Sequence, residues 1–237
     1  MRPSDDWTPL PHDPVEELAD GLLRVVGDLP RMALRRQMIV AKSRDGRLLV
    51  HNGIALEEEG MARLEALGEP TWLVVPNGWH RLDAARYRAR YPEITVVCPR
   101  GARRKVEAVV PVDLTYDAFE PTETLRLLHL RGLKEREGVL EVRGSDGVTL
   151  VLNDALFNQP HLPGLFGTVY RWLGQSGRPK VTAIARLTLV ADRRAYADHL
   201  RELADTPDLV RVIPGHIEPI VDDPAGTLRS VADALAR

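Results

Sequence analysis

The chain has 237 residues, 44% of them hydrophobic, so it is long enough to bury one large core. Its 32 Lys and Arg residues nearly balance 34 Asp and Glu, and the resulting net charge of −2 gives no general attraction for nucleic acid or an anionic membrane. No low-complexity linker divides the sequence. We therefore expect a single domain over residues 1–237, with an irregular N-terminal segment over residues 1–14.

The sequence carries few signs of a secreted or membrane protein. Its one cysteine, Cys98, lies in an apolar run, which indicates a buried, inert thiol in a reducing compartment rather than a disulfide framework. The N-terminus lacks a basic stretch followed by an apolar one, and no apolar run is long enough to span a bilayer. We expect a cytoplasmic protein that binds a small-molecule substrate or ligand, without nucleic acid or membrane as partner. The oligomeric state is left open.

The first half of the chain predicts an antiparallel meander and then alternating helices and strands. Strands are expected at 22–26, 38–42 and 48–51, and Asp45-Gly46 is typical of a hairpin turn between the last two. Apolar spacing predicts a helix over 56–67, with glutamates in its first turn. A strand at 71–75, a helix at 83–91 and a strand at 94–98 follow.

The second half of the chain also predicts both strands and helices. Strands are expected at 125–130, 139–142, 148–152 and 210–213, and helices at 165–173, 193–203 and 225–236. Two strand-rich halves, each flanked by helices, favour an α/β fold of the four-layer αββα sandwich type.

Two of the apolar runs lead into a side chain that can bind metal. One runs from Val148 to Asp154, and the other from Val210 to His216. Strand ends are where layered folds place ligands, so both residues are candidate site residues. The sequence holds no P-loop, dinucleotide-binding glycine motif, serine-hydrolase elbow or Cys-x-x-Cys pair, which excludes those classes at the level of motifs.

Four segments taken in order carry a resemblance to a known family. They are Gly46-Arg-Leu-Leu-Val-His-Asn-Gly53, Trp72-Leu-Val-Val-Pro-Asn-Gly-Trp-His80, Thr149-Leu-Val-Leu-Asn-Asp-Ala-Leu-Phe157 and Val212-Ile-Pro-Gly-His216. In their order and spacing the chain resembles the metallo-β-lactamase fold superfamily. The stretch from Val75 to Gly101 resembles an uncharacterised subgroup of it, a domain of unknown function.

The resemblance implies a metal site with missing ligands. Family members bind one or two metal ions, usually zinc, through an H-x-H-x-D-H loop, a later His, a bridging Asp and a final His. His80, Asp154 and His216 match the last His of the loop, the bridging Asp and the final His. The other three ligand positions of the loop hold residues that bind metal poorly or not at all, Val75, Asn77 and Trp79. His129 is available near the position of the later His.

The residues that match predict a reduced site, at most mononuclear. Two imidazoles and one carboxylate suit one zinc, iron or manganese ion, which could lower the pKa of a coordinated water to about 7. The expected protein is hydrolase-like, with an unknown substrate. The alternative is a metal-free relative that acts as a small-molecule-binding or protein-interaction module.

Each candidate also has an ordinary structural explanation. Asp154 could form an Asx-turn, His216 could be a packed loop residue, and His80 precedes a helix for which Asp83 is the expected N-cap; Asp83 is a weaker metal candidate. His51 is expected to support a strand end. Glu135 and Glu137 alternate with basic residues, which is typical of a solvated loop or edge strand, with a catalytic carboxylate as the alternative.

Overall fold

The larger of two β-sheets is formed by the N-terminal half of the chain. The structure, a computed structural model, describes residues 6–30, 32–215 and 218–237, apart from the side chain of Phe166. Seven strands follow one another in chain order: β1 (Glu16–Ala19), β2 (Leu22–Leu29), β3 (Met32–Lys42), β4 (Arg47–His51), β5 (Glu69–Val74), β6 (Thr95–Cys98) and β7 (Leu114–Thr115). β1 to β4 pair antiparallel, whereas β4 to β7 pair in parallel.

Helices cover one face of this sheet because the parallel strands need crossover connections. α1 (Glu58–Leu67) joins β4 to β5, α2 (Ala84–Arg90) joins β5 to β6, and a short 3₁₀ turn (Arg100–Ala102) with α3 (Arg103–Val106) follows β6. Alternation along β4 shows how the sequence specifies two faces. Leu48 and Val50 pack with the helices, and Leu49 between them faces the second sheet.

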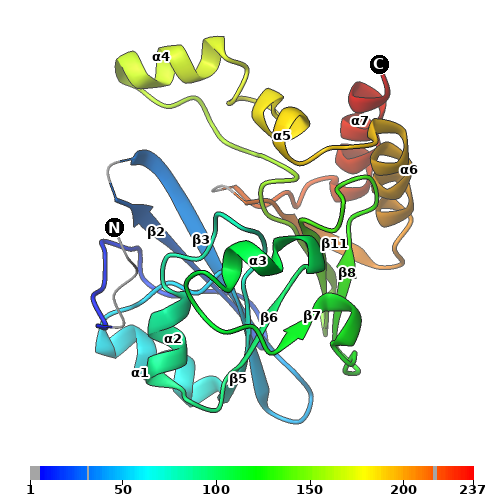
Figure 1. The fold of residues 1–237 in the computed structure, drawn as a ribbon. Coiled ribbons are helices and arrows are strands. Elements are labelled where there is room, and N and C mark those ends of the chain that lie inside the picture. The colour runs from blue at the N-terminus through cyan, green and yellow to red at the C-terminus, as the bar shows by residue number, and fades with distance from the viewer. Residues whose placement is uncertain (1–5, 31, 216–217) are drawn as a thin grey trace.

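The second sheet is built from the C-terminal half. Its strand order is β11 (Leu209–Ile213), β10 (Gly147–Val151), β9 (Gly138–Gly144) and β8 (Leu125–His129). β10 and β11 are parallel, and the long connection between them contains α4 (Gly164–Trp172), α5 (Ala183–Thr188) and α6 (Arg193–Ala204). With α7 (Pro224–Ala236), α6 covers the outer face of this sheet (Figure 1).

Three apolar clusters separate four layers. One lies between the first sheet and α1 to α3, and another between the second sheet and α5 to α7. The third lies between the sheets, where Trp72 and Val74 of the first pack with Leu127 and Leu140 of the second. The expected αββα sandwich is therefore confirmed, and the helices of the described residues include none long and apolar enough to cross a membrane.

The elements that the sequence failed to indicate are short. β1 has the sequence Glu-Glu-Leu-Ala and sits at a sheet edge, so it lacks an apolar alternation. β7 has 2 residues, α5 has 6 and α3 has 4, which is too few for a periodic pattern. A further 3₁₀ turn covers Tyr116–Ala118.

Cys98 is the last residue of β6 and lies in the core between the first sheet and its helices. Its exposed fraction is 0%, and burial raises the pKa of its thiol to about 12. Thiolate is the reactive form, so we expect no reaction of the native protein with Ellman's reagent at pH 8 and one thiol per chain after unfolding in guanidinium. Rapid labelling of the native protein would contradict the buried position.

Candidate functional site

Asp154 and His80 meet where two strands end. Asp154 follows β10 of the second sheet, and His80 lies in the loop after β5 of the first. His80 Nε2 is 3.0 Å from Asp154 Oδ1, and the side chains are 9% and 17% exposed. The fold thus brings together two of the three residues that the sequence predicted as metal ligands.

Asn77 organises the loop that carries His80. Its Oδ1 accepts hydrogen bonds from the backbone N–H groups of Trp79 (2.9 Å) and His80 (3.1 Å). Its Nδ2 donates to Asp154 Oδ2 at 3.0 Å and to Glu137 Oε2 at 2.9 Å. Asn77 is fully buried, and its hydrogen bonds fix the loop and orient Asp154.

Glu137 is a site residue that the sequence pattern concealed. Its side chain is fully buried and accepts from the backbone N–H groups of Asn153 (3.1 Å) and Ala155 (2.7 Å). Burial, and then the charge of Asp154, raise its pKa to about 8. The expectation of a solvated position was wrong for Glu137, because positive φ angles at Lys134 (51°) and Glu135 (55°) reverse the chain and turn Glu137 inward.

Glu135 itself behaves as expected. Its side chain is 40% exposed and forms an ion pair with Arg100, with Arg100 Nε at 2.6 Å from Glu135 Oε2. The sequence signal that separates the two glutamates is the apolar run Gly138-Val-Leu, which starts immediately after Glu137 and not after Glu135.

Asp83 is engaged in a buried cluster with two arginines. Its carboxylate is 1% exposed, forms ion pairs with Arg36 and Arg86, and accepts from the N–H of Ala55 at 3.1 Å. It occupies the N-cap position of α2 but makes no side-chain cap bond, so the expected capping interaction is not formed. Both carboxylate oxygens already have cationic partners.

Two further histidines named from the sequence occupy different surroundings. His51 ends β4 and is buried; burial, and then the charge of His80, lower its pKa to about 3, so the ring is neutral. Its Nε2 has no hydrogen-bond partner in the described part of the chain. His129 ends β8, and its Nε2 lies 2.8 Å from Asp117 Oδ1 in a contact that lacks hydrogen-bond geometry.

His216, the third predicted ligand, lies outside the described residues. The chain is described up to Gly215, whose N–H lies 3.0 Å from the carbonyl oxygen of Asn153 and 3.2 Å from that of Leu156. The chain therefore reaches residue 215 directly beside the turn that carries Asp154.

His80 and Asp154 fit part of a metal-binding set. Two ligand atoms about 2.0–2.1 Å from a tetrahedral zinc lie roughly 3.3 Å apart, so the observed pair would separate by only a few tenths of an ångström. Over residues 6–30, 32–215 and 218–237, no three His, Cys, Asp or Glu side chains form a group that could hold a metal. The described residues thus supply two donors, and a catalytic zinc needs three from the protein.

A cavity of about 540 Å³ opens over this pair. His80, Asp154 and Arg36 supply its charged lining, and its apolar walls come from the β2–β3 hairpin, the His80 loop and the α4–α5 segment. Tyr170 of α4 lines it, and burial, and then the charge of Asp154, raise the pKa of its hydroxyl to about 12. The remaining lining residues include Leu29, Met32, Leu34, Trp79, Leu82, Phe157, Ile184 and Leu189.

Comparisons with known proteins give a fold and no sequence family. No protein-family model and no curated protein sequence matches the chain. Among solved structures, a metallo-β-lactamase from Erythrobacter litoralis is similar, with a TM-score of 0.65 and 14% identity over 93% of this chain and 96% of that one.

Two further enzymes give the same result. A metallo-β-lactamase from Pontibacter korlensis has a TM-score of 0.62 and 11% identity over 92% of this chain and 98% of that one. FIM-1 from Pseudomonas aeruginosa, in its mono-zinc form, has a TM-score of 0.59 and 11% identity over 94% and 96%. The two sheets, their helices and these structural matches together establish that the chain has the metallo-β-lactamase fold.

Proposed function

We propose that the chain is a hydrolase-like protein that binds at most one metal ion, through His80, Asp154 and His216. The observation that supports this is the His80–Asp154 pair, which joins the ends of two sheets and lines a cavity of about 540 Å³. A zinc, iron or manganese ion there would polarise a carbonyl or phosphoryl oxygen. One of the similar enzymes was solved in a mono-zinc form, which supports a one-metal stoichiometry for the fold.

The chain's own residues have separate tasks in this proposal. Asn77 holds the His80 loop and fixes one oxygen of Asp154, which leaves the other oxygen and the imidazole on the cavity side. Walls of Leu, Met, Ile and Phe favour a substrate with an apolar group beside its ester, thioester, amide or phosphodiester bond.

Metal content and melting temperature test the proposal together. Elemental mass spectrometry of protein reconstituted with excess zinc, iron or manganese should give no more than one ion per chain. Zinc should raise the melting temperature of the wild type relative to chelator, because a ligand of the folded state stabilises it by mass action. His80→Ala, Asp154→Ala and His216→Ala should each abolish that difference.

His161→Ala is the matched control, because His161 is an exposed imidazole bonded to Ser176 at 2.8 Å, away from the cavity lining. It should keep the full response to zinc. Two ions per chain would contradict the reduced site.

The alternative is a metal-free binding module, and the bonds already made by Asp154 favour it. Both oxygens of Asp154 have protein partners, His80 and Asn77, so the site is internally satisfied. In that case the wild type would take up no ion and melt identically with zinc and chelator. Asp154→Ala would then lower the free energy of unfolding by about 1 kcal/mol through lost hydrogen bonds, with or without metal.

A further inference from the structure

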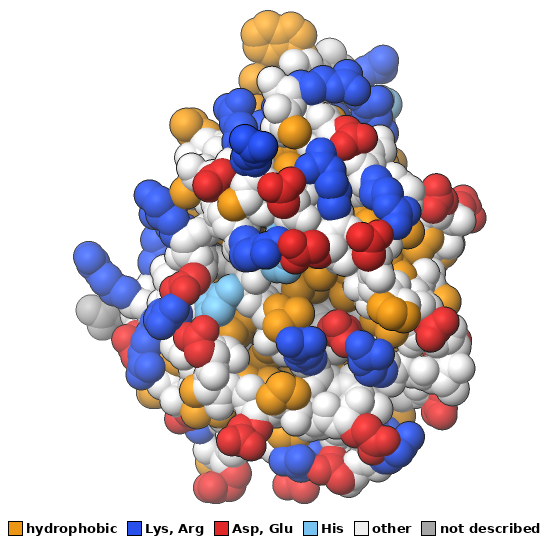
Figure 2. Space-filling model, turned by 90° about the vertical axis from the view of Figure 1, so that its right-hand side faces the viewer, with side chains coloured by type: hydrophobic (Ala, Val, Ile, Leu, Met, Phe, Trp, Pro, Cys, Tyr) orange, Lys and Arg blue, Asp and Glu red, His pale blue; other side chains and the backbone are white. Residues whose placement is uncertain are grey.

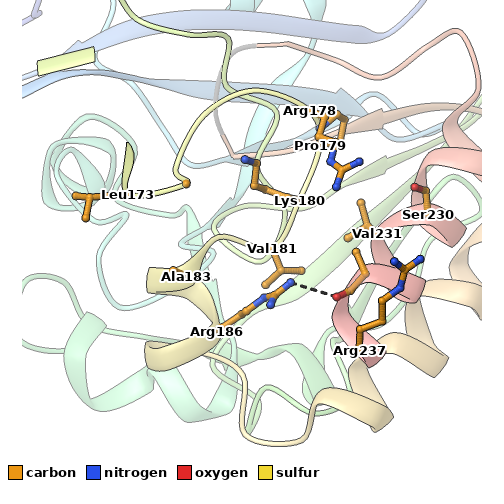
Figure 3. A pocket seen from close by; sticks show the side chains of 12 residues that line it. Leu173, Arg178, Pro179, Lys180, Val181, Ala183, Arg186, Ser230, Val231 and Arg237 are labelled. Atoms are coloured by element: carbon orange, nitrogen blue, oxygen red, sulfur yellow. Dashed lines mark hydrogen bonds between the residues drawn. The ribbon is translucent and has the colours of Figure 1, made fainter. Parts of the chain in front are cut away.

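A second cavity, of about 370 Å³, lies between the segment that leads into α5 and the outer helix α7 (Figure 3). It shares no lining residue with the cavity over His80 and Asp154. α5 separates the two: Ile184 and Ala185 line the first cavity, and Ala183 and Arg186 line the second. Chemistry at the second cavity can therefore be tested without touching the candidate metal ligands.

The polar lining of this cavity is cationic. Arg178, Lys180 and Arg186 line it together with Arg237, and its lining residues include no Asp or Glu. Figure 3 shows Arg186 extending from α5 toward α7, with Lys180 and Arg178 on the chain that precedes α5. Figure 2 shows many Lys and Arg side chains toward the upper end of the molecule, on the face with α6 and α7.

Among the described residues, these cations have no carboxylate partner, in contrast to arginines that lie in ion pairs. Arg201, for example, lies 2.8 Å from both Asp198 and Asp233, and Asp233 is the one acidic residue of α7. No carboxylate of the described residues lies within ion-pair distance of Arg178, Lys180 or Arg186. The sequence contributes to this, because residues 155–191 contain no Asp or Glu.

The cationic groups of Arg186 and Lys180 are only partly satisfied by acceptors of the protein. Arg186 Nη2 donates to the carbonyl oxygen of Ala234 at a long 3.4 Å, and its buried Nε has no partner in the described part of the chain. Lys180 Nζ donates to the carbonyl oxygen of Ser176 at 2.6 Å, and burial followed by the charge of Arg178 lowers its pKa. Like charges held close together repel, and an anion in the cavity would relieve this repulsion and accept from the unpaired donor of Arg186.

We infer that this cavity binds a ligand through a phosphate group, held by Arg178, Lys180 and Arg186. A phosphate offers the acceptor oxygens and the charge that guanidinium and ammonium groups bind most strongly. Leu173, Val181 and Val231 line the same cavity and would contact an organic part of the ligand. The phosphate could belong to a soluble monoester or to a lipid headgroup.

Isothermal titration calorimetry tests the site directly. Glycerol phosphate, inorganic phosphate and vesicles of phosphatidylcholine with or without phosphatidic acid are titrated into the full chain, with ionic strength held constant by sodium chloride. We expect saturable binding of at least one phosphate probe, weakened by added salt. Arg178→Ala and Lys180→Met should each weaken it roughly tenfold, as expected for a lost charged hydrogen bond.

The controls separate a site from a general ion effect. Arg178 is exposed, and its side chain makes no hydrogen bond or ion pair within the described part of the chain, so Arg178→Ala should keep the far-ultraviolet dichroism and melting temperature of the wild type in the absence of phosphate. Arg44→Ala, at an arginine whose side chain is 72% exposed in the β3–β4 turn, should bind like the wild type.

Two results would overturn the inference: no binding of any phosphate probe, or binding that Arg178→Ala and Lys180→Met leave unchanged. Preference for phosphatidic acid vesicles over glycerol phosphate would identify a lipid as the source of the phosphate, and the reverse a soluble ligand. Metal content plays no part in either result, so this test and that of the proposed function fail independently.

Discussion

Asp83→Ala should lower the free energy of unfolding by about 3–5 kcal/mol, because it removes the carboxylate from a buried ion pair and leaves the cations uncompensated. Arg36 and Asp83 are 2% and 1% exposed, and Arg86 is nearly as buried. The Ala55 N–H would lose its acceptor as well. Denaturation in urea, followed by far-ultraviolet dichroism, measures the change.

Asp198→Ala is the matched control for this measurement. Asp198 also pairs with an arginine, Arg201, but its side chain is 54% exposed, so its removal should change stability far less. A loss at Asp83 as small as that at Asp198 would mean that Asp83 acts as an ordinary exposed helix-terminal residue rather than as the centre of a buried cluster.

Glu137→Ala should lower the free energy of unfolding by about 3 kcal/mol, because it leaves several buried hydrogen-bond donors without an acceptor. The N–H groups of Asn153 and Ala155 and one N–H of Asn77 all bond to this carboxyl group. Glu135→Ala, two residues earlier at an exposed side chain, should change the free energy of unfolding much less. Equal effects of the two substitutions in urea denaturation would contradict the buried position of Glu137.

The same group should give the stability of the fold a pH dependence. The pKa of Glu137 is raised from 4.5 to about 8, so ionisation is harder in the folded than in the unfolded chain. Its contribution to stability is therefore complete below the unfolded pKa and is lost as pH rises through about 8. The free energy of unfolding of the wild type should fall relative to that of Glu137→Gln between about pH 5 and pH 8. A constant difference between the two proteins over this range would show that Glu137 ionises normally.

Periodicity was enough to predict the layers, and strand-end positions together with the family resemblance predicted the two residues that meet at the candidate site. Long apolar runs and the Asp-Gly hairpin fixed most strands, because alternation along a strand such as β4 records which face is buried. Asp154 was predicted from its position at a strand end and His80 from the resemblance to the family's metal-binding loop, and the fold brings the two side chains to 3.0 Å. His216 was predicted in the same way as Asp154 and remains a prediction.

What only the tertiary structure decided is the role of each polar residue around that pair. Local sequence gives the polar character of Glu137, Asp83 and Asn77 but not their surroundings, because burial and partners come from residues far away in the chain. Asn77 meets Glu137 across 60 positions, and Asp83 meets Arg36 across 47. A local pattern of alternating charge therefore made Glu137 resemble a surface residue, whereas the turn at Lys134 and Glu135 and the packing of two sheets place it in the core.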